Sequence, residues 1–95
     1  MSLERAAPPW QVSRWFNSAP LTLAGLHGRV VVAHAFQMLC PGCAMQALPQ
    51  MQRVHQMFPA DRLAVIGLHT VFEHHAAQGP LALEAFLHEY RYTFP

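Results

Sequence analysis

Charged side chains are scarce in this sequence. Only 12% of the 95 residues are Asp, Glu, Lys or Arg, and the formal net charge is +1. This leaves no strongly basic field of the kind that nucleic-acid-binding proteins use, so we expect no nucleic acid partner. The sequence also lacks an apolar run close to the roughly 18 residues that a membrane-spanning helix needs. We therefore expect no membrane span.

The first residues, Met1-Ser2-Leu3-Glu4-Arg5, lack the apolar centre of a signal peptide. This predicts a cytoplasmic protein, or a periplasmic one if a signal peptide has been removed. Internal repeats and low-complexity tracts are absent as well, and the length corresponds to one domain. Hydrophobic residues make up 53% of the chain, which is enough for a core of modest size.

Cysteine is also rare, but its placement is informative. The two cysteines, Cys40 and Cys43, flank Pro41-Gly42 and follow a β-rich run from Val30 to Phe36 that predicts a strand buried on both faces. Cys40 fits the N-cap of a helix with Pro41 at its first position, where free N–H groups and the helix dipole favour thiolate. Such settings lower the pKa of a thiol from about 8.5 to roughly 3.5–7.5. We predict a redox dithiol with Cys40 as nucleophile and Cys43, one turn into the helix, as resolving thiol.

Two alternatives stay open for these cysteines. A Cys-x-x-Cys pair can supply half of a zinc site, but the chain has no second pair, and its seven histidines are not spaced as ligands. A metal-binding module would have to use Cys40, Cys43 and a histidine. The other alternative is that the cysteines are inert. We expect no metal and no other cofactor.

Four of the histidines have positions from which burial and a possible role can be predicted. His34 lies in the predicted strand, where a hydrogen-bonded core residue is the simplest interpretation, and it is also the first candidate for proton transfer with Cys43. His69 ends a second apolar run, and His74 and His75 follow it in a polar loop. We expect these three to be solvated, with a transition-metal site as the alternative.

Apolar periodicity predicts the remaining elements. A helix from Cys40 to about Phe58 should kink near Met45 to Leu48, because Pro49 removes a backbone donor. A strand from Leu63 to His69 then completes a right-handed βαβ unit with a parallel sheet. A second helix runs from Gly79 or Pro80 to about Tyr90. The expected buried faces of the two helices are Leu48, Met51, Val54 and Phe58, and Leu83, Phe86, Leu87 and Tyr90. Short strands are expected at Pro20–Leu23, on a sheet edge, and from Phe94-Pro95 onward.

Taken in order, these landmarks resemble the thioredoxin superfamily, and within it the TlpA-like and redoxin branch. The matching segments are Gly28-Arg29-Val30-Val31-Val32, Cys40-Pro41-Gly42-Cys43, Leu48-Pro49, Leu63 to Leu68, Phe86-Leu87 and Tyr90 to Phe94-Pro95. The resemblance covers about residues 20 to 95. It implies an α/β, thioredoxin-like domain there, with a parallel βαβ unit and flanking helices. Residues 1–19 are then an N-terminal extension that packs on the edge of the domain.

The sequence departs from the family pattern at three places. Leu39 precedes the first cysteine, where the family usually carries an aromatic residue. Pro49 comes nine residues after Cys40, where eight is usual, which predicts an extra residue or bulge in the first helical turns. The sequence ends before the family's cis-proline loop and its C-terminal ββα portion. An exposed sheet edge would result, and we expect a homodimer to cover it.

The resemblance implies a thiol-disulfide oxidoreductase with Leu39, Pro41 and Gly42 forming the active-site loop around the dithiol. Its expected partners are a protein or small-molecule disulfide and an external thiol reductant. Antioxidant activity is typical of the superfamily, but a peroxidase is less expected here because no hydroxyl or arginine flanks Cys40. The alternative is a truncated module that dimerises and is weakly active.

Overall fold

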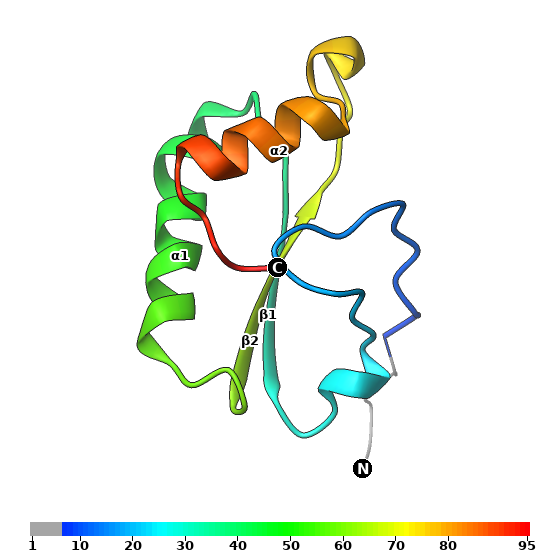
Figure 1. Ribbon diagram of the computed structural model, residues 1–95, viewed down its shortest axis with the longest axis vertical. Coiled ribbons are helices and arrows are strands. Elements are labelled where there is room, and N and C mark those ends of the chain that lie inside the picture. Colours follow the sequence, from blue (N-terminus) through cyan, green and yellow to red (C-terminus); the bar gives the residue numbers. More distant parts are fainter. Residues whose placement is uncertain (1–6) are drawn as a thin grey trace.

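A computed structural model describes residues 7–95 of the chain (Figure 1). The chain forms two parallel strands, β1 (Val30–Phe36) and β2 (Leu63–His69). Two helices, α1 (Leu48–Met57) and α2 (Pro80–Glu89), pack against them. Two short 3₁₀ turns lie at Ala24–Leu26 and His75–Ala77. Both strands have the predicted bounds, and the predicted parallel βαβ unit is confirmed. No helix in this part of the chain has the length and apolar character needed to cross a membrane.

The two strands pair in register, with Val30 opposite Leu63 and Phe36 opposite His69. Bonds from the Val30 N–H to the Arg62 carbonyl and from the Thr70 N–H to the Phe36 carbonyl bracket the ladder. Parallel strands bond to a neighbour through alternate residues. The backbone N–H and carbonyl groups of the even-numbered residues of β2 therefore point to β1, and those of the odd-numbered residues point to the outer edge of the sheet.

The outer edge of β2 is met by the C-terminal segment. The N–H of Gly67 donates to the Pro95 carbonyl at 2.8 Å, and the Phe94 ring lies against Gly67. This is the place that a third strand would take, as the sequence predicts for Phe94-Pro95, although the segment itself does not form a strand.

One core lies between the sheet and the two helices. It joins side chains from β1, β2, α1, α2 and the C-terminal segment: Phe36, Met38, Leu48, Met51, Val65, Leu83, Leu87, Tyr92 and Phe94. Side chains of α1 and α2 enter the same core, so both helices pack on one face of the sheet. Ile66 is fully buried on the opposite face of β2.

The helix after the dithiol contains the predicted irregularity. Helical backbone begins at Pro41, and Cys43–Ala47 forms a π-helical turn that passes directly into α1. A π turn accommodates one residue more than an α turn, and Pro49 has no N–H to offer the Met45 carbonyl. The extra residue between Cys40 and Pro49 is therefore taken up at the place where both a bulge and a kink are predicted.

Two predictions, one of burial and one of structure, are wrong. β1 is not buried on both faces, since Val30 and Val32 are 62% and 37% exposed. Within residues 7–95, β1 has a single neighbouring strand to help cover it. No strand forms over Pro20–Leu23. There, the Thr22 hydroxyl accepts the Gly25 N–H and the Thr22 carbonyl accepts the Leu26 N–H, which builds a turn instead of a ladder.

The expected helix faces are correct in their centres and wrong at their ends. Leu48, Met51, Leu83 and Leu87 are buried, and Val54 and Phe86 pack against them. Phe58 and Tyr90 are exposed. Both follow the last residue of their helix, and the backbone of Phe58 is already extended, so the helical period no longer directs their side chains inward.

The described part of the N-terminal extension, residues 7–19, lies beside α2 and the C-terminal segment. Asn17, with a positive φ of 65°, donates through Nδ2 to the carbonyls of Tyr92 and Phe94. Arg14 forms an ion pair with Glu84 of α2 at 2.6 Å. Residues 1–6 lie outside the described range, and the boundary between residues 19 and 20 stays a prediction.

Candidate active site

Cys40 lies at the junction between the loop after β1 and the following helix. Its N–H donates to the Gln37 carbonyl at 3.1 Å, and its own carbonyl accepts the first helical bond from the Ala44 N–H at 2.9 Å. Helical backbone begins at the next residue, Pro41. This is the N-cap position that the sequence predicts for Cys40.

The surroundings of Cys40 favour its thiolate. The pKa of Cys40 is lowered first by a hydrogen bond from the Cys43 thiol, and then by the backbone N–H groups of Cys43 and Gly42. Slight burial and the negative charge of Glu73 act in the opposite direction. Free N–H groups at a helix N-terminus stabilise a neighbouring anion, so the local geometry gives the physical reason for the shift.

Cys43 has the opposite tendency. Its pKa is raised, first because its thiol is the donor to Cys40 and then through burial and the Cys40 charge, while a hydrogen bond from the Gln37 backbone acts against this. The side chain is half-buried and packs against the core. Both cysteines are free thiols here. The site is therefore a dithiol in which one sulfur ionises before the other.

Three successive backbone N–H groups before the helix each have an acceptor. Met38 N–H donates to Nε2 of His69 at 3.2 Å, and Leu39 N–H donates to Oε1 of Gln78 at 2.9 Å. Cys40 N–H donates to the Gln37 carbonyl, as described above. Since a buried N–H without a partner is costly, these acceptors fix the path of the chain into Cys40.

Two buried amides and a carboxylate connect this loop to the segment after β2. Gln37 and Gln78 are almost fully buried, at 1% and 3% exposure. Oε1 of Gln37 accepts the N–H groups of Phe72 and Glu73, and its Nε2 donates to Oε1 of Glu73 at 3.3 Å. Nε2 of Gln78 donates to the Glu73 carbonyl at 2.7 Å. The two glutamines thus hold Glu73 against the dithiol loop.

Sequence reasoning missed Gln37, Gln78 and Glu73. One signal was available for Gln37, because an amide placed directly between a buried strand and a dithiol has to find partners when the loop is covered. For Gln78 and Glu73 the sequence holds no comparable signal, since both act through contacts with residues more than 30 positions away.

The other predicted site residues occupy different surroundings. Leu39 is 50% exposed, and Pro41 and Gly42 are exposed, so the rim of the dithiol is open to solvent. His34 lies in β1 opposite Gly67 and is half-buried. Its Nε2 atom is buried with no hydrogen-bond partner among residues 7–95, so the structure connects it to neither cysteine by a hydrogen bond.

The prediction for His69 is wrong, while His74 and His75 are exposed as predicted. His69 is half-buried, packs against Phe36 with the rings tilted and their centroids 5.2 Å apart, and accepts the Met38 N–H. Burial lowers its pKa, which favours the neutral imidazole that this acceptor role requires. Within residues 7–95, no three His, Cys, Asp or Glu side chains are grouped as metal ligands.

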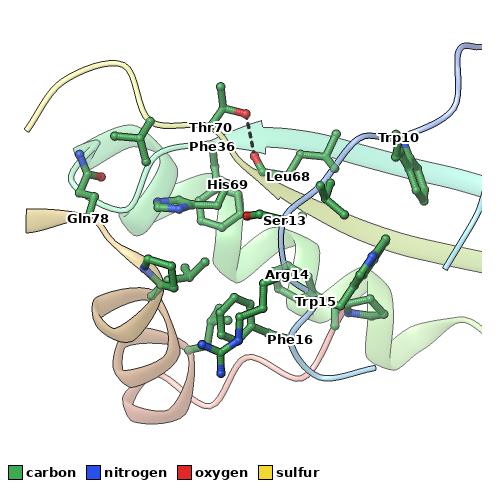
Figure 2. A pocket seen from close by; sticks show the side chains of 18 of the residues that line it. Trp10, Ser13, Arg14, Trp15, Phe16, Phe36, Leu68, His69, Thr70 and Gln78 are labelled. Carbon is green, nitrogen blue, oxygen red and sulfur yellow. Dashed lines mark hydrogen bonds between the residues drawn. The ribbon is translucent and has the colours of Figure 1, made fainter. Parts of the chain in front are cut away.

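A cavity of about 520 Å³ lies behind His69, between the N-terminal segment and α2 (Figure 2). Trp15 and Phe16 line it on one side, and the carboxyl end of β2 lines the other. His69 and Gln78, which anchor the dithiol loop, also form part of its wall, whereas the cysteines do not. The cavity therefore adjoins the supports of the dithiol and is separate from the sulfur atoms.

Comparison with solved structures confirms the thioredoxin-like fold class that the sequence predicts. No family model and no curated protein matches the chain. Two solved structures do. One, described as a thioredoxin-like superfamily protein, is 60% identical with a TM-score of 0.89 over 93% of this chain and 58% of the other. The second, a thiol-disulfide isomerase from Corynebacterium glutamicum, is 45% identical with a TM-score of 0.86 over 94% of this chain and 59% of the other. The chain thus spans somewhat less than two thirds of the length of either protein.

Proposed function

The chain belongs to the thioredoxin-like superfamily, and we propose that it acts as a thiol-disulfide oxidoreductase through its Cys-Pro-Gly-Cys dithiol. One observation carries the proposal: Cys40 lies at a helix N-terminus with its pKa lowered, while the pKa of Cys43 beside it is raised. A dithiol of this kind has one sulfur ready to attack and one held back to resolve. The likeness to a thiol-disulfide isomerase supports the same chemistry.

The reaction would proceed by two thiol-disulfide exchanges. The Cys40 thiolate attacks one sulfur of a substrate disulfide, an S–S bond to the substrate forms, and the other substrate sulfur leaves as a thiolate that takes up a proton. Cys43 then loses its proton and attacks the Cys40 sulfur. The Cys40–Cys43 disulfide forms, and the second substrate sulfur leaves and is protonated. Two electrons and two protons have passed to the substrate, and an external thiol must reduce the chain again.

The proposal also covers the substrate, the branch of the superfamily, the location and the role of His34. The substrate would be a protein or small-molecule disulfide, and the site needs no cofactor. The TlpA-like or redoxin branch and a cytoplasmic location, or a periplasmic one after removal of a signal peptide, are proposed from the sequence. His34 is proposed as a proton-transfer group for Cys43, on the ground that its buried Nε2 lacks a partner among the described residues. Peroxide reduction ranks lower.

A redox titration tests the proposal. The purified chain is equilibrated in glutathione buffers, and its free thiols are alkylated and counted by mass spectrometry, with Cys40→Ser as the control. A reversible two-electron transition that the control lacks is the expected result. Thiols that do not respond to the buffer ratio, or that react only after a chelator is added, would contradict the proposal.

A second candidate function is a dimerising module of low activity. It is favoured by Val30 and Val32, which are exposed on β1, a strand with a single neighbour in the described sheet. An exposed apolar strand of this kind promotes edge pairing with a second copy. Sedimentation at several concentrations checks the oligomeric state. A dimer that Val30→Lys converts to monomer, in a chain without redox turnover, would favour this candidate over the first.

A further inference from the structure

Gln37 occupies a central place in the dithiol loop. Its backbone carbonyl accepts the Cys40 N–H, and its backbone also hydrogen-bonds to Cys43. Its side chain turns the other way and holds Glu73 through three bonds, to the N–H groups of Phe72 and Glu73 and to the Glu73 carboxylate. One buried residue therefore connects the backbone of Cys40 and the side chain of Cys43 to one carboxylate.

Glu73 is held from two sides. Gln37 binds its N–H and its carboxylate, and Gln78 binds its carbonyl at 2.7 Å while also accepting the Leu39 N–H next to Cys40. An exposed carboxylate in a free loop would spread over many positions and exert little average field. The clamp of Gln37 and Gln78 restricts this carboxylate to the neighbourhood of the dithiol.

We propose that Gln37 is a positioning residue that keeps the Glu73 carboxylate beside the dithiol, where its charge opposes the Cys40 thiolate and shifts the pair toward its disulfide form. The helix N-terminus stabilises the thiolate, and Glu73 sets a limit to that stabilisation. The effect on redox chemistry rests on the proposed function. When the Cys40 thiolate is less stabilised, the reduced form of the dithiol is less stable, and the dithiol is a stronger reductant.

The other titratable groups at this end of the sheet act differently. Cys43 donates a hydrogen bond to Cys40, and His69 is turned to the Met38 N–H as an acceptor. His74 and His75 follow Glu73 on the exposed loop. Glu73 is a charged group outside the dithiol whose field opposes the Cys40 thiolate.

Glu73→Gln tests the inference, because the amide keeps an oxygen that accepts the Gln37 bond but removes the charge. The measurement is the rate of Cys40 alkylation by iodoacetamide as a function of pH in the reduced chain. At a pH below the midpoint we expect the thiolate fraction to rise about two- to fivefold, the order of one unit charge acting at short range through a water-like medium. The redox potential should become more positive.

Asp61→Asn is the matched control. It removes the same charge at an exposed position before β2, at the end of the sheet opposite to the dithiol. Seven residues of strand span roughly 20 Å, about two Debye lengths at ordinary salt. The control should leave the alkylation profile unchanged. An equal effect of Asp61→Asn would mean that net charge, not the placement of Glu73, governs the thiol, and would overturn the inference.

Salt and a second variant separate charge from structure. Raising the salt from about 0.01 M to about 1 M shortens the Debye length from about 30 Å to about 3 Å, so the difference between wild type and Glu73→Gln should shrink. Gln37→Met should raise the thiolate fraction in the wild type and add little to Glu73→Gln. No change in Glu73→Gln, or a change that salt leaves intact, would overturn the inference.

These readouts are independent of turnover. A chain that shows the Glu73 effect but does not equilibrate with glutathione would refute the proposed function alone. A reversible dithiol whose alkylation profile ignores Glu73 would refute the inference alone.

Discussion

His69 and Met38 are joined by a hydrogen bond in which the Met38 N–H donates to Nε2 of the imidazole at 3.2 Å. An imidazole nitrogen accepts a hydrogen bond only when it carries no proton, so the proton of the neutral ring must lie on Nδ1. The bond ties the end of β2 to the loop that leads into Cys40. The protonation state of one histidine therefore affects how firmly the dithiol loop is held.

Stability should depend on pH through His69. Burial lowers its pKa in the folded chain below the ordinary value of 6.5, so the unfolded chain binds a proton first as the pH falls. The contribution is complete above pH 6.5, is lost as the pH falls from there through the folded pKa, and changes no further below it. Urea unfolding at a series of pH values between 8 and 5, the range in which histidines titrate, measures this loss.

His69→Gln should reduce the pH dependence over that range, since the amide can accept the Met38 N–H without titrating. His75→Gln, at an exposed position, is the control and should keep the wild-type profile. If both variants retain the same slope of unfolding free energy against pH, the assignment to His69 is wrong.

Gln78→Leu should destabilise the chain and disturb the dithiol loop. The change removes the acceptor of the Leu39 N–H and the donor to the Glu73 carbonyl from a side chain that is 3% exposed. An unsatisfied buried group costs about 1–3 kcal/mol. Thermal unfolding measures the loss, and Gln56→Leu on the exposed side of α1 is the control. A loss no larger than that of the control would contradict the anchoring role.

The contrast between strands and anchors shows what a sequence can and cannot predict. Val30–Phe36 and Leu63–His69 have the predicted bounds because continuous apolar runs between turn residues determine strands locally. The burial of β1 is not local. It depends on what covers the strand, and Val30 and Val32 remain exposed because β1 has a single neighbour in the described sheet.

The candidate site divides in the same way. The position of Cys40 follows from Pro41 and the preceding strand, and the nine-residue spacing to Pro49 predicts the irregular turn found at Cys43–Ala47. The bonds from Leu39 to Gln78 and from Gln37 to Glu73 join residues 39 and 36 positions apart. No local propensity encodes such pairs, because they form only when the two loops meet at the carboxyl end of the sheet.

Leu48→Ala should strongly destabilise the core. Leu48 begins α1 directly after the π turn and has no exposed surface. Replacing a buried leucine by alanine costs about 2–5 kcal/mol through lost burial and the cavity that remains. Leu81→Ala on α2 deletes the same atoms from a side chain that is 79% exposed and should cost far less. Urea unfolding of both variants compares them, and similar losses would mean that the core does not include Leu48.

Gly67→Ala should loosen the C-terminal segment from β2. A Cβ atom at this position would lie 2.9 Å from Cε1 of Phe94 and 3.0 Å from Cε1 of Phe36, so both rings have to move. Overpacking of this kind costs about 1–3 kcal/mol. Because the Gly67 N–H also binds the Pro95 carbonyl, we expect faster hydrogen exchange at this amide as well as a lower free energy of unfolding.

The matched control is Gly79→Ala, where an added Cβ would meet nothing within 4 Å. It should leave the exchange rate at Gly67 near the wild-type value and lower the unfolding free energy less than Gly67→Ala does, since its cost is limited to the N-cap of α2. The comparison separates the effect of the methyl group at the sheet edge from the general effect of replacing a glycine in the unfolded chain. If Gly67→Ala is as stable as Gly79→Ala and exchanges as slowly as wild type, Phe94 and Pro95 are not packed against β2 in solution.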